Sequence, residues 1–243
     1  MSDTTGVIRG SGRTLDEMRA VTISTGYAPY AEGSALIKMG NTHVLCTATV
    51  EESVPPFLAE SGQGWITAEY GMLPRSSPVR IPRRRSAESG RTKEIARLIG
   101  RSLRAAIDLS KLGERSILVD CDVFRADGGT RTASITGGYV AVHLAIMRLI
   151  ESGILEASPI AHMVAAISAG VVDGRVMLDL EYEEDSKAAV DLNVVMTDAG
   201  DIVELQATAE DGAYSRAQLD EMLDLSSQGI HELLNLQRQA LAG

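Results

Sequence analysis

The sequence predicts an α+β fold in which mixed β-sheets are covered by helices, all within a single domain. Strand-like segments occur in two groups that each precede a helix, without the strict strand–helix alternation of a doubly wound parallel sheet. The chain has 243 residues, 44% of them hydrophobic, so it is long enough to bury a sizeable core. No linker rich in Pro, Gly or Ser divides it, which favours one compact unit.

The first group of strands lies in residues 21–50. There the turn Gly40-Asn41 separates two runs rich in apolar residues, Thr and Val, which predicts a β-hairpin. Another strand is expected at 64–70. Apolar residues recur at helical spacing over 91–109 and predict an amphipathic helix with a basic outer face.

The rest of the chain follows a similar plan. A strand at 116–124 leads into a glycine-containing turn and a long apolar helix that ends near residue 153. Hairpin turns then separate four further strands, and a last helix closes the chain. We expect these five elements at 163–172, 176–182, 190–197, 202–207 and 215–241.

Charge is unevenly distributed along the chain. The formal net charge is -10, yet residues 75–104 hold ten basic and two acidic residues and therefore carry +8. The remaining 13 basic and 31 acidic residues carry -18. Arginine predominates in the basic segment, and its guanidinium group pairs bidentately with phosphate. We expect an exposed loop at 75–86 to bind a polyanion through Arg75, Arg80, Arg83, Arg84 and Arg85.

Several classes of protein and site lack support. The chain has no run of about 18 uncharged apolar residues and no signal-peptide pattern, so we expect a cytoplasmic protein without membrane association. Cys46 and Cys121 alternate with apolar residues and are expected to be core thiols. The four histidines show no zinc-ligand spacing. Walker A and G-x-G-x-x-G motifs are absent, which removes the usual support for ATP or dinucleotide binding.

The turn at 127–132 has the features of an anion site. Gly128 and Gly129 would let the backbone approach a ligand closely. Thr130 and Arg131 would donate hydrogen bonds at a helix N-terminus, where the amides and the helix dipole favour phosphate or a phosphodiester. The same spacing also fits an ordinary strand-to-helix turn with Thr130 as the N-cap, so both interpretations stay open.

Acidic residues gather near the end of the strand expected at 176–182. They are Asp179, Glu181, Glu183, Glu184, Asp185 and Asp191. Such carboxylates could hold Mg²⁺ beside phosphate oxygens. Asp191 begins an apolar strand, where a buried carboxylate is costly unless a metal or a donor compensates it. The three glutamates also fit solvated loop residues.

A polyanion path, an anion site and a pair of carboxylates are together what phosphoryl transfer on a nucleic acid requires. The nucleophile must be positioned, the charge on the phosphate oxygens neutralised and the leaving oxygen protonated. The spacing leaves open whether water or phosphate attacks.

Several long motifs closely resemble those of the ribonuclease PH family. They are G-Q-G-W-I-T-A-E-Y-G-M-L-P-R at 62–75, G-R-T at 90–92, A-D-G-G-T-R-T-A-S-I-T-G at 126–137 and D-L-N-V-V-M at 191–196. The resemblance extends from about Arg9 to the final helix. It implies the RNase PH-like fold, of the ribosomal protein S5 domain 2-like type, as one catalytic domain over 9–243. Residues 1–8 are then expected to be a disordered tail.

The resemblance also implies an activity. The family's enzymes are phosphorolytic 3′→5′ exoribonucleases, or tRNA nucleotidyltransferases, that trim tRNA precursors. They transfer the terminal nucleotide to inorganic phosphate and release a nucleoside diphosphate, and the reverse reaction extends RNA. Phosphate is therefore expected as co-substrate and Mg²⁺, or Mn²⁺, as cofactor. The chain is expected to bind RNA and not DNA, and to form a homohexamer built as a trimer of dimers.

Site residues carry over where this sequence matches the family motifs. The resemblance places phosphate binding at Arg91, Gly129, Thr130 and Arg131. It makes Asp185 and Asp191 the catalytic residues, which would hold the metal ion and help to protonate the departing 3′ oxygen. Thr25 and Pro29 depart from the family, since many members have basic residues there, and the loop at 76–89 is shorter than usual.

Two other functions are compatible with parts of this pattern. One is a catalytically inert, RNA-binding ring subunit of an exosome-like assembly, although such subunits typically lack part of the residue set that is intact here. The other is a metal-dependent nuclease that uses water and would release nucleoside monophosphates without added phosphate.

Overall fold

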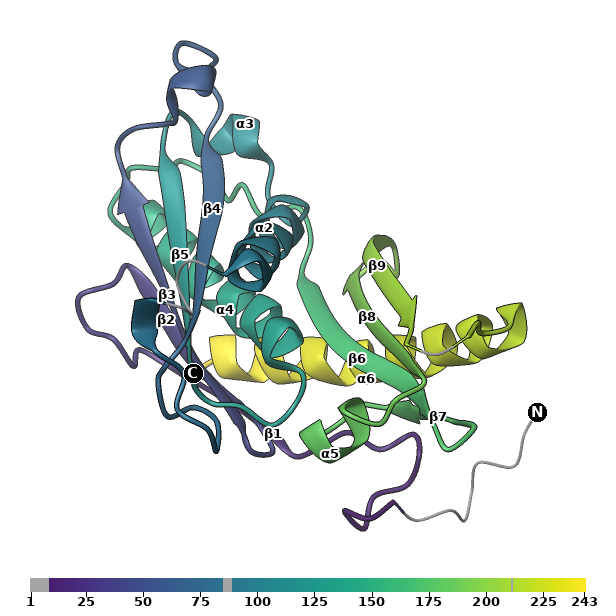
Figure 1. Cartoon of the computed structure of the whole chain (residues 1–243). Coiled ribbons are helices and arrows are strands. Elements are labelled where there is room, and N and C mark those ends of the chain that lie inside the picture. The colour runs from purple at the N-terminus through teal and green to yellow at the C-terminus, as the bar shows by residue number, and fades with distance from the viewer. Residues whose placement is uncertain (1–8, 85–88, 211) are drawn as a thin grey trace.

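The computed structural model describes residues 9–84, 89–210 and 212–243. Two β-sheets stand side by side with helices packed between and beside them, which confirms the predicted α+β class (Figure 1). The tail expected at 1–8 lies outside the described residues, and so does Arg85.

The first sheet has five strands in the order β1-β2-β3-β5-β4. The expected hairpin forms β2 and β3, which pair antiparallel on either side of Gly40-Asn41. The last strand of the sheet, β4, runs parallel to β5, so the chain must cross over between them, and it does so through helices α2 and α3. The elements are β1 (Val21–Thr25), β2 (Gly33–Met39), β3 (Thr42–Glu51), the 3-10 helix η1 (Pro56–Leu58), β4 (Trp65–Met72), α2 (Gly90–Arg104), α3 (Leu109–Leu112) and β5 (Ser116–Arg125).

The second sheet has four antiparallel strands in the order β7-β6-β8-β9. Helix α4 leads into it from the first sheet, α5 lies between β7 and β8, and α6 follows β9. The elements are α4 (Thr130–Glu151), β6 (Val164–Val172), β7 (Arg175–Leu178), α5 (Tyr182–Asp185), β8 (Val190–Thr197), β9 (Ile202–Ala209) and α6 (Arg216–Leu241).

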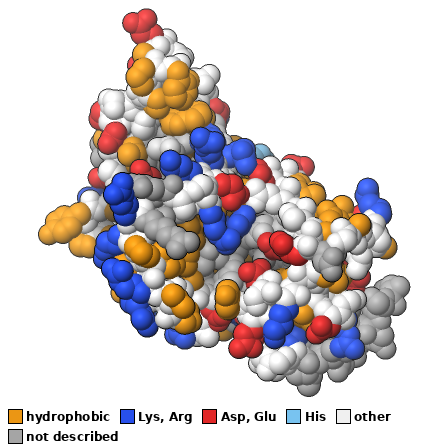
Figure 2. Space-filling model, viewed as in Figure 1, with side chains coloured by type: hydrophobic (Ala, Val, Ile, Leu, Met, Phe, Trp, Pro, Cys, Tyr) orange, Lys and Arg blue, Asp and Glu red, His pale blue; other side chains and the backbone are white. Residues whose placement is uncertain are grey.

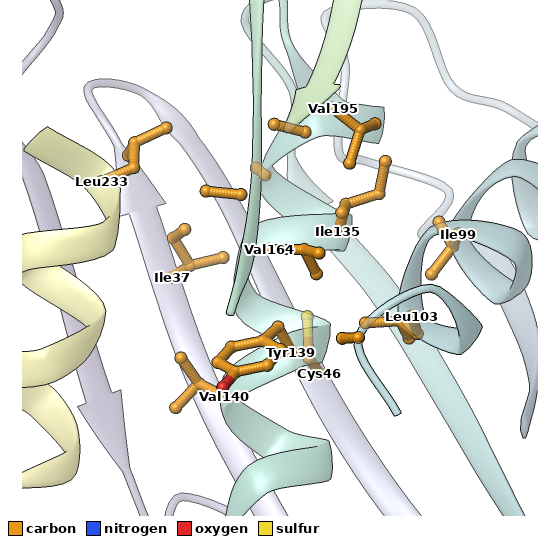
Figure 3. Close-up of a cluster of buried hydrophobic side chains, with 14 of the residues drawn as sticks. Ile37, Cys46, Ile99, Leu103, Ile135, Tyr139, Val140, Val164, Val195 and Leu233 are labelled. Carbon is orange, nitrogen blue, oxygen red and sulfur yellow. The ribbon is translucent and has the colours of Figure 1, made fainter. Parts of the chain in front are cut away.

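Helix α4 lies between the two sheets, and α6 covers the other face of the second sheet (Figure 1). Adjacent residues of β6 show this arrangement. Ala166 hydrogen-bonds to Thr136 of α4 through its amide, at 3.1 Å, whereas Ile167 packs against Gly229 of α6. Successive side chains of a strand point to opposite faces, so every residue of β6 is buried. Side chains from both sheets and from α2, α4 and α6 form one core cluster (Figure 3).

Helix α4 is long and apolar enough to cross a membrane by composition, but 72% of its most apolar stretch is buried inside the protein. Two glycines let it approach the first sheet. A Cβ atom at Gly33 of β2 would lie 2.0 Å from the carbonyl oxygen of Ala141. One at Gly137 of α4 would lie 2.8 Å from Ile37 Cγ2 and 3.0 Å from the Cys46 sulfur. Both cysteines are buried free thiols, as predicted.

Two expected elements end earlier than the sequence pattern predicts. The helix expected over 91–109 stops at Arg104, because Asp108 caps the separate helix α3 by accepting a hydrogen bond from the Ser110 amide. The strand expected over 176–182 stops at Leu178, because Asp179 adopts a left-handed backbone conformation with φ 51°. The chain then turns into the short helix α5, which the sequence pattern did not predict.

The close contact at Gly137 predicts opposite effects for two neighbouring substitutions. Gly137→Ala should lower the free energy of unfolding by about 1–2 kcal/mol, because overpacking outweighs the gain in helix propensity. Gly138→Ala is the matched control, since its Cβ would lie 3.5 Å from Val119 Cγ1, an ordinary contact. Gly138→Ala should leave the free energy of unfolding unchanged or raise it by up to about 1 kcal/mol. Chemical denaturation at one protein concentration measures both, and equal effects would contradict the packing argument.

Candidate active site

A cleft of about 570 Å³ opens between the two sheets at the N-terminus of α4. It lies where the end of β5, the start of β8 and helix α5 come together. The six residues that the sequence assigned to phosphate, catalysis and metal all line it: Arg91, Gly129, Thr130, Arg131, Asp185 and Asp191. The fold therefore brings together residues up to 100 positions apart in the chain.

The glycine turn forms one wall of this cleft. Gly128 and Gly129 have φ values of 72° and 64°, and a Cβ at Gly128 would lie 2.4 Å from the Leu180 carbonyl oxygen. The buried Thr42 hydroxyl fixes the turn by accepting from the Asp127 amide at 2.9 Å and donating to the Gly128 carbonyl at 2.6 Å. Gly129, and not Thr130, is the N-cap of α4, so the hydroxyl of Thr130 is not a helix cap. The first amides of α4 are therefore directed into the cleft.

Two arginines supply positive charge beside the turn. Arg131 lies in the first turn of α4, with its side chain 17% exposed, and it donates a 3.0 Å hydrogen bond to Gln206. Arg91 is the second residue of α2 and reaches the cleft from the other side of the turn. With the helix dipole, these groups favour an anion at this end of the cleft.

Asp185 and Asp191 form the opposite wall. Burial raises the pKa of Asp185, while the charges of Arg91 and Arg131 oppose the rise. Burial and the neighbouring charge of Asp185 raise the pKa of Asp191, although Asn193 donates hydrogen bonds of 3.2 and 3.3 Å to its carboxylate. Both carboxyls therefore hold a proton more readily than in water, as a general acid requires.

The donor set of the cleft fits a hard divalent cation. Among the described residues there is no group of three or more His, Cys, Asp and Glu side chains suited to a metal. Three aspartates line the cleft, but Asp127 accepts a hydrogen bond from the Tyr182 amide at 3.2 Å, which leaves Asp185 and Asp191 as the candidate carboxylate ligands. Ser168 also lines the cleft, and its hydroxyl is buried without a hydrogen-bond partner in the described part of the chain. Mg²⁺ commonly binds through one or two carboxylates and takes its other ligands from water and substrate phosphates.

Asp179 and Glu184, which the sequence placed among candidate metal ligands, have structural partners. Asp179 is fully buried and accepts from the backbone amide of Arg19 at 2.8 Å and from its guanidinium at 2.9 and 2.6 Å. Arg19 also donates to the Asp127 carbonyl in the glycine turn. Glu184 accepts hydrogen bonds from Arg9, which also binds the Leu178 carbonyl at 2.6 Å.

The chain segment before β1 thus ties the glycine turn to the loop that carries Asp185. Arg13 also donates to the Asp179 carbonyl, at 3.1 Å. None of the three supports, Arg9, Arg13 and Arg19, was predicted from the sequence. The sequence does show three arginines before the first strand, but their partners near the cleft lie about 110 to 175 residues away along the chain. Tyr70 was also missed as a contact of the site; its hydroxyl lies 2.8 Å from Thr130 Oγ1.

The basic segment divides into two parts. Arg75, Arg80, Arg83 and Arg84 are exposed. On the face shown in Figure 2, Lys and Arg side chains gather mainly over the half formed by the first sheet and α2. On α2 itself, Arg101 pairs with Glu204 at 2.6 Å and Arg104 stacks on Trp65 at 4.3 Å. These two arginines therefore serve packing, whereas the arginines at 75–84 lie on the exposed loop. Thr25 and Pro29 line a separate hollow.

The buried Asp179 carboxylate predicts a pH-dependent stability difference. Burial alone would raise its pKa, but hydrogen bonds and the charge of Arg19 outweigh burial and hold the pKa below its usual value. Its contribution should be complete above about pH 5 and decline as the pH falls through the range below about 4. Asp179→Asn should lower the free energy of unfolding by about 3–5 kcal/mol at pH 7, and by less at pH 3.

Asp173→Asn is the matched control for this measurement. Asp173 also has a positive φ, 50°, but its side chain is exposed. A loss in Asp179→Asn that equals the loss in Asp173→Asn, or that does not change with pH, would contradict the role given to the ion pair.

Comparisons with known proteins identify the family to which this chain is similar. The model of the "3' exoribonuclease family, domain 1" matches residues 17–149, and that of "domain 2" matches residues 162–229. A protein named Ribonuclease PH from Solibacter usitatus is 56% identical over 238 residues, which cover 97% of this chain and 100% of that protein. One of the same name from Roseobacter denitrificans is 54% identical over 237 residues, with the same coverage.

Solved structures share the fold. A chain of the Archaeoglobus fulgidus exosome with RNA bound to the active site superposes with a TM-score of 0.79 at 26% identity, over 94% of this chain and 92% of that chain. A chain of an archaeal exosome core superposes with a TM-score of 0.75 at 24% identity, over 95% and 91%. Because the two family models together match most of the sequence, the chain belongs to the 3′ exoribonuclease family.

Proposed function

We propose that this chain is a phosphate-dependent 3′→5′ exoribonuclease that trims the 3′ ends of tRNA precursors. The observation that carries the proposal is the cleft itself. A helix N-terminus with Thr130, Arg131 and Arg91 faces two aspartates with raised pKa values. Inorganic phosphate is the co-substrate of this reaction, and RNA is the macromolecular substrate.

The chemistry follows from the two walls of the cleft. The first amides of α4, with Thr130 and the two arginines, would hold inorganic phosphate and neutralise its charge. An oxygen of this phosphate attacks the phosphorus of the last phosphodiester bond. A new P–O bond forms, and the bond from that phosphorus to the 3′ oxygen of the preceding nucleotide breaks. A nucleoside diphosphate leaves, and the RNA is one nucleotide shorter.

The departing 3′ oxygen must take up a proton. Asp185 and Asp191 are suited to supply or relay it, since their raised pKa values keep a proton available nearer to neutral pH. In the reverse reaction the same group would accept the proton, and RNA would be extended. In their ionised forms the same two aspartates would hold Mg²⁺, or Mn²⁺, which supplies charge neutralisation at the phosphate oxygens when bound.

The exposed loop arginines, Arg75, Arg80, Arg83 and Arg84, would guide RNA toward the cleft by attraction to its backbone phosphates. Arg85 belongs to the same proposed path. Two of the similar structures are exosome assemblies, which favours an oligomer, and we propose a homohexamer built as a trimer of dimers. Cytoplasmic location and the expected absence of DNA and membrane binding stay predictions.

The nucleotide released from RNA tests the proposed reaction. With a 3′-extended tRNA and Mg²⁺, the protein should release nucleoside diphosphates only when phosphate is added. Arg91→Ala should raise the phosphate KM roughly 10- to 100-fold, because it removes a charged hydrogen-bond donor, with RNA affinity largely kept. Arg216→Ala, at an exposed arginine paired with Asp220, is the control and should leave the KM unchanged.

The other possible products separate the competing functions. Nucleoside monophosphates released without phosphate would instead identify hydrolysis. RNA binding without any release would identify an inert subunit. An unchanged phosphate KM in Arg91→Ala would remove Arg91 from the phosphate site.

Asp191→Asn tests the wall of the cleft that carries the two aspartates. The substitution keeps the shape of the side chain and its position on β8 but removes its titration. We expect kcat to fall by about 10²- to 10⁴-fold, the usual contribution of general acid catalysis. Asp201→Asn, at an exposed turn residue of the same sheet, is the control. Light scattering should give the same particle mass for both variants and the parent. Full activity in Asp191→Asn would remove Asp191 from the catalytic residues.

A further inference from the structure

Tyr70 contacts the phosphate-binding turn from outside the cleft. It lies on β4, is only 6% exposed, and its hydroxyl oxygen is 2.8 Å from Thr130 Oγ1. Thr130 lines the cleft, whereas the lining does not extend to Tyr70. Among the described residues, Thr130 is the hydrogen-bond partner found for the Tyr70 hydroxyl. Tyr70 also lines an adjoining hollow that shares Arg91 and Met72 with the cleft, and the contact of its hydroxyl with the cleft lining is the one to Thr130.

The direction of this hydrogen bond follows from the charge of the site. The Thr130 hydroxyl has one proton, and a bound anion can only accept hydrogen bonds. Arg91, Arg131 and the first amides of α4 all favour an anion at this position. Thr130 can give its proton to that anion only if it accepts the hydrogen bond from Tyr70. The opposite direction would point an oxygen lone pair of Thr130 at the negative charge.

The surroundings of Tyr70 keep its phenol protonated, so that its hydroxyl can donate a hydrogen bond. Burial raises the pKa of its phenol, although the hydrogen bond with Thr130 and the charges of Arg91 and Arg131 oppose the rise. The phenol therefore stays protonated at neutral pH. The parallel pairing of β4 with β5, with Tyr70 opposite Cys121, fixes the backbone that carries it.

We infer that Tyr70 is a positioning residue for inorganic phosphate: it donates a hydrogen bond to Thr130 and thereby directs the Thr130 hydroxyl proton toward the phosphate. In this arrangement no covalent bond forms or breaks, and no proton is transferred. The inference rests on the proposed phosphorolytic function and extends it, because it assigns part of the phosphate affinity to a residue of β4 that does not touch the ligand.

The inference predicts a specific kinetic change. Tyr70→Phe keeps the ring and removes the donor, so Thr130 can rotate or turn its lone pair toward the phosphate. The KM for phosphate should rise roughly 3- to 10-fold, the range expected from one hydrogen bond. The KM for RNA and the kcat at saturating phosphate should stay within about 2-fold of the parent. Titration calorimetry with inorganic phosphate alone should show the same loss of affinity, without dependence on turnover.

Tyr139→Phe is the matched control. Tyr139 is a fully buried tyrosine of the central helix, and its hydroxyl lies 3.5 Å from His143 Nδ1, within the core. This substitution also removes one buried hydroxyl but should leave the phosphate KM unchanged. A second comparison uses Thr130→Val, which keeps the branched shape. If Tyr70 acts through Thr130, Tyr70→Phe should have no further effect on phosphate affinity in the Thr130→Val background.

The outcomes separate this inference from the proposed function. A parent protein whose RNA degradation does not depend on phosphate would overturn the proposed function. A phosphate-dependent parent combined with an unchanged phosphate KM in Tyr70→Phe would overturn only the role of Tyr70. Three other results would also overturn the role of Tyr70. They are a rise in the RNA KM alone, an equal rise in the phosphate KM of Tyr139→Phe, and additive effects of the Tyr70 and Thr130 substitutions on phosphate affinity.

Discussion

Helix α4 is buried between two sheets for most of its length, yet its first turn opens into the cleft. The burial requires a close approach to the first sheet, which Gly33 and Gly137 permit because neither carries a side chain. The open first turn requires a sharp change of direction after β5, which Gly128 and Gly129 make possible through positive φ angles. The same helix therefore stabilises the core at one end and presents unpaired amides at the other.

Charges of both signs share the cleft, which would couple the proposed phosphate binding to proton transfer. The charges of Arg91 and Arg131 lower the pKa of Asp185, whereas burial raises it. A phosphate bound at the helix N-terminus would neutralise part of the arginine charge that the aspartates experience. Their pKa values would then rise further, and a proton would be held more firmly at the position where the leaving oxygen needs it. In the proposed reaction, binding of phosphate would therefore favour the protonated form of the aspartate that acts as the acid.

Local pattern predicted most of the fold, and it failed where distant residues determine the backbone. Apolar runs separated by turn residues correctly predicted the hairpin of the first sheet and the strand β8. The end of β7 was wrong because the left-handed turn at Asp179 depends on Arg19, which is 160 residues away. The glycine turn and the two aspartates were singled out from their residue types, and the motif resemblance added Arg91 and the role of each residue. Their supports, such as Arg9 and Thr42, form contacts that no local spacing reveals.

The two walls of the cleft come from different parts of the chain. The phosphate-binding groups lie in the segment matched by the first family model, and the two aspartates lie in the segment matched by the second. Most of the packing that joins these segments involves side chains away from the cleft, around α4 and β6. A descendant of this chain could therefore lose either wall and still fold.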